Sequence, residues 1–414
     1  MQPGDAEGRN RRTAWAVTWV AYATSYLGRK GFGVAKKVIE RELGVGRGAL
    51  AAIDTGYLAF YALGQFWSGA LGDRIGARKL LGGGLLLSAA MCACFGAGKT
   101  ALVLGVAFAV NGLAQSAGWP ATTRAMAEWT TADNRRRVMA FWATCYQFGG
   151  IGAAVGAAYL LRFGWRAAFF VPALVLAAVG ALVLSTLAPG PGAPERAPSG
   201  DARADDPARR DAIRATVRSP VLWCYGFSYF AIKLIRYSFL FWLPYYLADS
   251  LGYAPDRAGY LSTAFEVGGV FGVVGAGLFS DRFRGVSRSL LSAVMLVGLT
   301  GMLVLYTQVA ALGPWANVVG LTLVGVCLYG PDSLLSGAAA QDAGGEYAAA
   351  TATGLVNGIG SVGAILQGAL NAWVSEKYGW HAVFVVLIVL AGIGALVLVP
   401  TFKKDRTAAP ARVG

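Results

Sequence analysis

Long stretches without a charged side chain recur along this chain and restrict it to a membrane-spanning fold. A helix needs about 20 apolar residues to cross a bilayer. One stretch, 289–331, has 43 residues, which is enough for two crossings with a break at Gly313-Pro314. Because only 14% of the residues are charged and 56% are hydrophobic, an ordinary soluble enzyme is excluded. The other uncharged stretches are 80–98, 100–123, 138–161, 167–194, 347–375 and 378–402.

Four further stretches are mostly apolar but contain a few charged residues. Together with the uncharged stretches they bring the number of predicted crossings to about twelve. We therefore expect an all-α membrane protein with twelve transmembrane helices, of the class that carries solutes rather than catalyses reactions. The four stretches are 13–33, 49–72, 220–248 and 258–280.

The two halves of the chain repeat each other, with three landmarks in the same order at offsets of 207 to 215 residues. Such a repeat indicates a parallel duplication related by pseudo-twofold symmetry. We expect a six-helix half at 1–188, a second at 219–414, and a flexible proline-rich cytoplasmic linker at 189–218. The landmarks pair Arg29 with Arg236, Gly69-Ala-Leu-Gly-Asp73-Arg74 with Gly277-Leu-Phe-Ser-Asp281-Arg282, and Gly164-Trp165 with Gly379-Trp380.

The net charge of +14 is distributed as in a membrane protein rather than a nucleic-acid-binding one. If the N-terminus is cytoplasmic, 22 of the 36 lysines and arginines fall in cytoplasmic segments and 9 on the opposite face. This bias follows the positive-inside rule. It predicts a multi-pass protein of the plasma (inner) membrane with both termini in the cytoplasm, and no nucleic-acid partner.

Two arginines, Arg29 and Arg236, lie inside predicted crossings at matching places in the two halves. An arginine at membrane depth costs roughly 3 kcal/mol or more, so it indicates a binding site or pathway. A guanidinium presents a planar fork of donors that matches phosphate oxygens and stays charged at any working pH. The pair therefore predicts an anion site. The alternative is an internal salt bridge of either arginine with Glu266 or Asp332.

Polar and aromatic side chains share helix faces with these arginines. Tyr22, Tyr26 and Arg29 are spaced four and three residues apart, and Lys233 lies three residues before Arg236. Aromatic rings can stack against a sugar or small polyol, although such stripes also serve packing. The predicted substrate-binding set is Arg29, Arg236, Lys233, Tyr22, Tyr26, Tyr61, Gln65, Gln115, Trp119, Tyr146, Glu266 and Asp332.

Several motifs resemble the major facilitator superfamily and, within it, the organophosphate:phosphate antiporter family. The superfamily's signature in its second loop is similar to Gly69-x-Leu71-Gly72-Asp73-Arg74-x-Gly76-Ala77-Arg78-Lys79. The resemblance implies conformational or gating roles for Asp73, Arg74, Arg78, Asp281 and Arg282. Four segments resemble the antiporter family. They are Tyr26-Leu-Gly-Arg29-Lys30-Gly-Phe32, Asn111-Gly-Leu-Ala-Gln115-Ser-Ala-Gly118-Trp119-Pro120, Lys233-Leu-Ile-Arg236-Tyr237-Ser-Phe-Leu-Phe-Trp242-Leu-Pro244 and Leu328-Tyr329-Gly330-Pro331.

The chain departs from the family's glycerol phosphate carriers at three positions. Gln65 and Tyr146 stand where those carriers have a lysine and a histidine, and Lys233 stands where they have a tyrosine. The sugar-phosphate exchanger branch shares the lysine. We expect Lys233 to replace the cation missing at Gln65.

The resemblance and the arginine pair together predict a secondary transporter that exchanges an organic phosphate for inorganic phosphate by alternating access. Two alternatives remain: proton-coupled uptake of another organic anion through Glu266 or Asp332, and a membrane receptor that senses a sugar phosphate. The expected partners are a small phosphate-bearing anion and the lipid bilayer. We expect a monomer with no cofactor and no metal.

Overall fold

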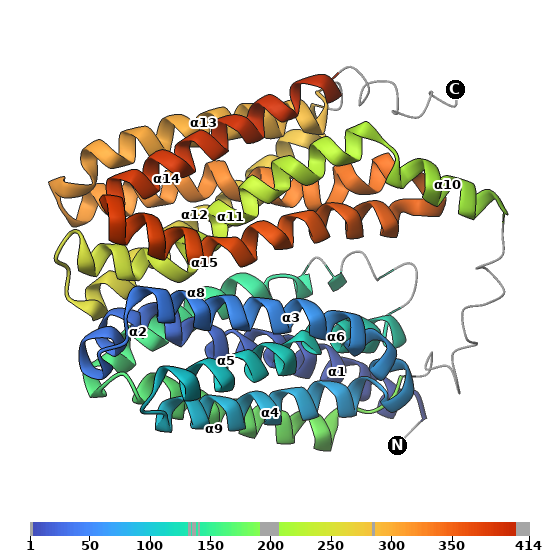
Figure 1. The fold of residues 1–414 in the computed structure, drawn as a ribbon. Helices are drawn as coiled ribbons and strands as arrows, with labels where there is room; N and C mark the ends of the chain where they lie inside the picture. The colour runs from blue at the N-terminus through green and yellow to red at the C-terminus, as the bar shows by residue number, and fades with distance from the viewer. Residues whose placement is uncertain are drawn as a thin grey trace. The chain divides into compact units, whose positions relative to one another are not determined.

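The computed structural model describes residues 3–130, 134, 138–139, 141–190, 207–283 and 286–402. These residues form helices joined by short turns, and the described part of the chain contains no strand (Figure 1). The first half contains α1 (Pro3–Ser25), α2 (Leu27–Leu43), α3 (Arg47–Ile75), α4 (Ala77–Ala97), α5 (Ala101–Ser116), α6 (Gly118–Glu128), α8 (Cys145–Leu160) and α9 (Ala167–Thr186). The second contains α11 (Pro220–Asp249), α12 (Pro255–Arg282), α13 (Arg288–Val309), α14 (Pro314–Ser333) and α15 (Ala340–Val397), with the short helix α10 (Pro207–Val217) before it.

Helix length and composition confirm the predicted fold class. Seven helical segments of the described residues are long and apolar enough to cross a membrane. The last of them holds two predicted crossings, because Gly379, with φ of 80°, interrupts α15. The other predicted crossings correspond to α1–α2, α3, α8 and α11, which are shorter or carry charged and tyrosine side chains. The seven segments are Ala77–Ala97, Ala101–Glu128, Ala167–Thr186, Pro255–Ser280, Arg288–Leu312, Pro314–Gly345 and Thr351–Thr401.

The chain clusters into two compact units. Unit 1 comprises Met1–Ala197 with Leu247–Tyr260, and unit 2 comprises Pro198–Tyr246 with Leu261–Gly414. The segment Leu247–Tyr260 joins α11 to α12 in the second half of the sequence, yet it packs with unit 1. The predicted bounds of the two six-helix halves, 1–188 and 219–414, stay predictions.

Equivalent glycines bring equivalent helices together in the two units. In unit 1, a β-carbon on Gly112 of α5 would collide with the backbone oxygen of Tyr57 on α3. In unit 2, a β-carbon on Gly325 of α14 would collide with the backbone oxygen of Phe265 on α12. Small residues of this kind allow membrane helices to approach closely. Repeated close contacts at matching places support the internal duplication.

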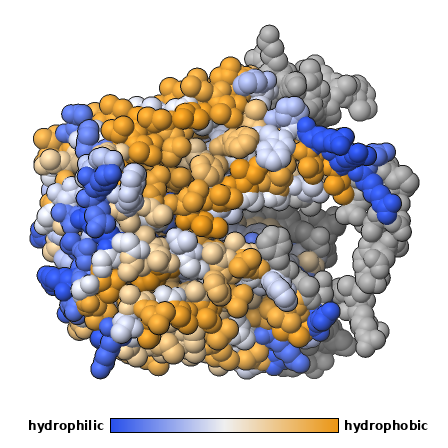
Figure 2. All heavy atoms as spheres, viewed as in Figure 1, coloured by the Kyte–Doolittle hydropathy of each residue, from blue (hydrophilic) through white to orange (hydrophobic). Residues whose placement is uncertain are grey.

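On the face that Figure 2 shows, hydrophobic side chains cover most of the helix lengths, and hydrophilic ones gather near helix ends. Within unit 1, alanine and larger apolar side chains fill the core where α1, α4, α6 and α9 meet, with α4 and α9 side by side (Figure 1). The linker departs from expectation. We predicted a flexible connection at 189–218, but Pro207–Val217 is helical, because proline suits a first helical turn and alanine and arginine favour its continuation.

Candidate functional site

Arg29 lies just past the break between α1 and α2, at the first turn of α2. Its side chain is half-buried. Its Nε donates a hydrogen bond of 2.8 Å to Oε1 of Gln115, and its Nη2 donates a longer one of 3.4 Å to the hydroxyl of Ser25. No carboxylate within the described residues pairs with it. The guanidinium therefore keeps an uncompensated charge, with its Nη groups little used by the protein.

Neutral side chains hold Gln115 so that its oxygen faces Arg29. The amide nitrogen of Gln115 donates to the hydroxyl of Ser88 at 3.2 Å and to Oδ1 of Asn111 at 3.4 Å. Asn111 in turn donates to the backbone oxygen of Gly28 at 2.7 Å, one residue before the arginine. Tyr57 donates to the same Gln115 oxygen at 3.2 Å. Because both ends of the amide are engaged and Gln115 is buried, it orients the arginine.

Aromatic rings surround the remaining faces of this arginine. The guanidinium carbon lies 4.5 Å from the ring centre of Tyr26 and 5.7 Å from that of Tyr61. Tyr22, Trp119 and Tyr146 form a second layer, with ring centres 5.3 to 6.0 Å apart. Guanidinium–ring contacts stabilise the cation without neutralising it.

Seven of the predicted site residues therefore come together in unit 1: Arg29, Tyr22, Tyr26, Tyr61, Gln115, Trp119 and Tyr146. Gln65 does not join them. Its side chain is exposed on α3 and makes no hydrogen bond to any described residue. Whether it contacts substrate stays a prediction.

Arg236 in unit 2 has a different partner. Its Nη1 donates to Oδ2 of Asp332 on α14 in an ion pair of 2.8 Å, and its guanidinium carbon lies 4.6 Å from the ring centre of Tyr329. The sequence left an internal salt bridge with Glu266 or Asp332 open as an alternative for either arginine, and Arg236 forms it with Asp332. The pairing arises because α14 carries an aspartate beside α11. Nε of Arg236 and Oδ1 of Asp332 are buried and have no hydrogen-bond partner within the described residues.

Lys233 lies one turn before Arg236 on α11. Its ammonium donates to the hydroxyl of Ser361 at 3.2 Å and to the backbone oxygen of Asn357 at 3.5 Å, both on α15. It also lies 5.2 Å from the ring centre of Tyr229. Among the described residues, no carboxylate forms a salt bridge with it. Glu266 is half-buried on α12 and is not the partner of Arg236.

The five predicted conformational residues lie at helix ends in their respective units. Arg74 lies in the last turn of α3, Arg78 lies in the first turn of α4 and Arg282 ends α12, all with exposed side chains. The side chains of Asp73 and Asp281 lie outside what the structure describes. Their gating roles stay predictions.

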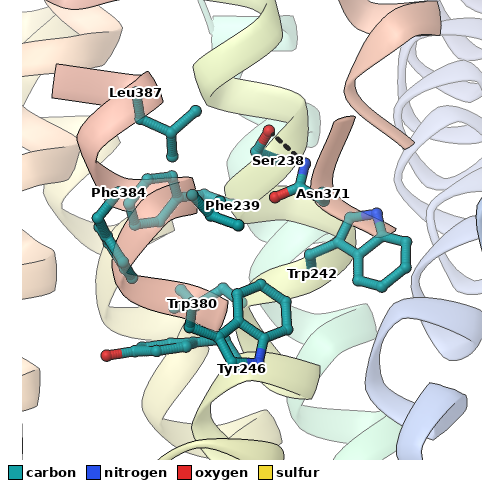
Figure 3. A pocket seen from close by; sticks show the side chains of 10 residues that line it. Ser238, Phe239, Trp242, Tyr246, Asn371, Trp380, Phe384 and Leu387 are labelled. Atoms are coloured by element: carbon teal, nitrogen blue, oxygen red, sulfur yellow. Dashed lines mark hydrogen bonds between the residues drawn. The ribbon is translucent and has the colours of Figure 1, made fainter. Parts of the chain in front are cut away.

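Each unit contains a cavity. In unit 1, Tyr22, Ser25, Ser88, Gln115 and Gly118 help to line a cavity beside the Gln115 network. In unit 2, α11 and α15 enclose a mainly aromatic pocket where Asn371 donates a 2.7 Å hydrogen bond to the Ser238 hydroxyl (Figure 3). Trp242, Tyr246, Trp380 and Phe384 also line this pocket, which contains none of the predicted site residues (Figure 3).

The sequence did not predict one buried ion pair. Lys36 on α2 and Asp54 on α3 form a salt bridge with both side chains fully buried. The two residues are 18 positions apart in the sequence and on different helices, so only the tertiary structure brings them together. In the described part of the chain, no group of three histidine, cysteine or acidic residues is arranged to hold a metal ion.

The helical fold and the charged groups inside it are typical of a polytopic membrane transporter. The chain belongs to the Major Facilitator Superfamily, whose family model matches residues 18–368. It is 32% identical to Sugar phosphate exchanger 3 of Gallus gallus, over 86% of this chain and 79% of that protein. It is 30% identical to the Glucose-6-phosphate exchanger SLC37A2 of Xenopus laevis, over 86% of this chain and 80% of that protein. These relatives confirm the resemblance to organophosphate antiporters.

Solved structures support the same fold. A bacterial homolog of the human lysosomal transporter Spinster, in an inward-facing and occupied conformation, has a TM-score of 0.78 at 15% identity, covering 97% of this chain and 99% of that one. A point mutant of the nucleoside transporter NupG has a TM-score of 0.76 at 14% identity, covering 95% of this chain and 100% of that one. At such low identity the likeness concerns the fold alone.

Proposed function

We propose that this protein exchanges a phosphate ester of a sugar or glycerol for inorganic phosphate by alternating access. Arg29 and Arg236 bind the phosphoryl oxygens, and the rings of Tyr22, Tyr26, Tyr61, Trp119 and Tyr146 accommodate the organic group. Relatives at about one-third identity are named as sugar phosphate and glucose-6-phosphate exchangers. The protein works in the inner membrane with both termini in the cytoplasm, as its charge bias favours.

The single observation that carries the proposal is the state of Arg29. Its guanidinium is half-buried and fixed by a neutral amide, and no carboxylate in the described residues compensates its charge. Burying an uncompensated charge more deeply is costly. Any conformational change that encloses Arg29 therefore proceeds more readily with an anion bound to it. A carrier that reorients only when loaded is an exchanger.

The test uses purified protein in liposomes loaded with labelled phosphate. We expect efflux of label only when phosphate or a phosphate ester is present outside. Efflux into buffer that lacks any phosphate compound, at the same rate, would contradict exchange. The absence of any transport would favour the receptor alternative.

Asp332 favours one second candidate, proton-coupled uptake of an organic anion. Its Oδ1 is buried and has no hydrogen-bond partner within the described residues, so it could receive a proton when the other oxygen releases Arg236. The same liposomes distinguish the two functions. Uptake driven by an imposed pH gradient, without phosphate inside, would support proton coupling, whereas its absence would support exchange.

A further inference from the structure

Helix α10, inside the linker, has one buried side and one exposed side. Thr216 is buried and Ile213 is half-buried, while Arg214, Val217 and Arg218 are exposed. The buried side packs against α15, within the same unit. Figure 2 shows α10 as a hydrophilic projection from the end of unit 2. The outward direction of the arginines is therefore fixed by the packing of the opposite side of the helix.

Two arginines on this surface, Arg214 and Arg218, make no polar side-chain contact with the described part of the protein. Arg214 and Arg218 are four residues apart, so they are neighbours on one face. Neither side chain makes an ion pair or hydrogen bond with any residue that the structure describes. Arg210, one turn earlier, is also exposed, and Asp211 is the one acidic residue between Pro207 and Val217. The surface carries an excess of positive charge.

Exposed aromatic rings follow directly along the chain. Trp223 is 40% exposed and Phe227 is 56% exposed on the first two turns of α11, with ring centres 5.8 Å apart. The indole nitrogen of Trp223 donates a 2.9 Å hydrogen bond to the backbone oxygen of Val217, the last residue of α10. This bond ties the rings to the arginine-bearing helix. Tryptophan on a membrane-spanning helix typically lies at the level of the lipid headgroups.

We propose that this surface binds an anionic phospholipid, with the headgroup phosphate on Arg214 and Arg218 and the upper acyl chain against Trp223 and Phe227. A cation pair alone would fit any soluble anion. The exposed rings next to it favour an amphiphile, since they offer contact to hydrocarbon and nothing to a free phosphate. The site is separate from Arg29 and Arg236 and does not depend on the transported substrate.

The test measures lipid retention by native mass spectrometry of the purified full-length protein with added phosphatidylglycerol or phosphatidylcholine. We expect the wild type to retain phosphatidylglycerol in preference to phosphatidylcholine. Each arginine near an anionic surface contributes about fivefold in affinity, so Arg214→Gln with Arg218→Gln should weaken retention about 25-fold. Trp223→Ala should weaken retention as well, whereas a site for a soluble anion would be indifferent to it.

Three further results decide the matter. The matched control Arg41→Gln with Arg257→Gln removes two exposed cations elsewhere and should leave retention unchanged. Arg29→Lys should also retain the lipid fully, and millimolar inorganic phosphate should not displace it. Equal retention by the Arg214 and Arg218 double variant and the wild type would overturn the proposal. So would displacement by inorganic phosphate, or an equal loss in the control.

Discussion

The two arginines occupy matching places in the repeat, yet their surroundings differ in one decisive respect. Arg29 donates to the neutral amide of Gln115, whereas Arg236 donates to the carboxylate of Asp332, and both hydrogen bonds are 2.8 Å long. The partners come from corresponding parts of the repeat, α5 and α14, which carry the matching glycines Gly112 and Gly325. Duplication preserved the cation and its supporting helix, whereas the partner differs in chemistry and in position, since Gln115 lies three residues after Gly112 and Asp332 lies seven after Gly325.

The neutral partner of Arg29 and the charged partner of Arg236 imply different roles for the two arginines. Arg29 can accept an anion without losing a partner. To bind the anion, Arg236 must release Asp332 or contact both at once. The cost of weakening this ion pair offsets part of the free energy of anion binding. Leaving a buried carboxylate unpaired costs about 1–3 kcal/mol or more. We therefore expect unit 1 to dominate affinity and unit 2 to govern how readily the anion leaves.

The largest expected effect is that of Arg29→Lys. Lysine keeps the charge but loses the planar fork and the oriented hydrogen bond to Gln115. Losing two charge-assisted hydrogen bonds reduces exchange by about 100-fold or more. Arg236→Lys should reduce exchange to a similar extent, because the fork is lost there too. The measurement is labelled phosphate exchange in liposomes, normalised to reconstituted protein.

Arg124→Lys is the matched control for both variants. Arg124 pairs with Glu128 at 3.2 Å within α6, and lysine can preserve that pair. The control should exchange at nearly the wild-type rate. Near-normal exchange by Arg29→Lys or Arg236→Lys would break the assignment of both arginines to phosphate.

Gln115→Glu makes the first half resemble the second. The new carboxylate would lie where Oε1 now accepts from Arg29, giving that arginine an internal counter-ion. The anion must then compete with it, and KM for phosphate should rise by about 10- to 100-fold. The measurement is exchange against external phosphate concentration. Because the added negative charge is the cause, Gln115→Met serves as control and should raise KM less. An unchanged KM for Gln115→Glu would mean that Arg29 does not face substrate.

Asp332→Asn makes the second half resemble the first. The amide oxygen can still accept from Arg236, but the competing charge is gone. We expect KM for phosphate to fall by about 5- to 10-fold, with maximal exchange reduced because the anion is released more slowly. Concentration-dependent exchange separates these two effects. A higher KM would instead show that Asp332 positions Arg236 and does not compete with the anion.

Lys233→Tyr tests the smaller cation of unit 2. Its ammonium donates hydrogen bonds to the Ser361 hydroxyl and the Asn357 carbonyl, so it contributes positive electrostatic potential rather than a defined ion pair. We expect KM to rise about fivefold, and Gln65→Lys to restore part of the loss. Non-additivity of about 0.5–3 kcal/mol in the double-mutant cycle would indicate coupling. Strict additivity would mean that Lys233 has a structural role. The variant Ser361→Ala measures how much the hydrogen bond from Lys233 to Ser361 contributes.

Local patterns predicted most of the fold, and they picked out the seven residues that come together around Arg29, whose contact with substrate stays a prediction. Apolar stretches reveal helices directly, and spacings of three and four residues placed Tyr22, Tyr26 and Arg29 on one face. The repeat offset found Arg236. These signals lie within one helix or one repeat, so they need no knowledge of packing.

Local sequence patterns could not show which residues far apart in the sequence pair with each other. Glu266 and Asp332 were equal candidates for Arg236, and only the register of α14 against α11 selects Asp332. The orientation of the Gln115 amide depends on Ser88, 27 residues away in sequence. The helix at Pro207–Val217 lacks a strong apolar period and depends on packing against α15 for its one-sided exposure.

The smallest expected effect concerns a second asymmetry. Unit 1 includes Leu247–Tyr260 from the second repeat, whereas unit 2 includes no part of 1–188. Asp249 fixes that segment by pairing with Lys37 at 2.6 Å and Arg47 at 2.8 Å. If α11 and α12 move relative to the first repeat during transport, these pairs must break. Asp249→Asn should then raise maximal exchange by up to about fivefold, the range of partly exposed ion pairs, with KM unchanged.

The gain in maximal exchange expected for Asp249→Asn should be equal near pH 6 and pH 9. Partial burial alone would lower the pKa of Lys37, but hydrogen bonds to Asp249 and Glu40 more than offset it, so the pKa is raised. A cation whose folded pKa is raised contributes fully below its unfolded pKa and loses that contribution only as pH rises through the folded one. Both test conditions lie below that window. Asp256→Asn is the control, since its pair with the exposed Arg162 is longer, at 3.7 Å, and should matter less. A gain confined to one pH, or an equal gain in the control, would show that Asp249 does not restrain this segment.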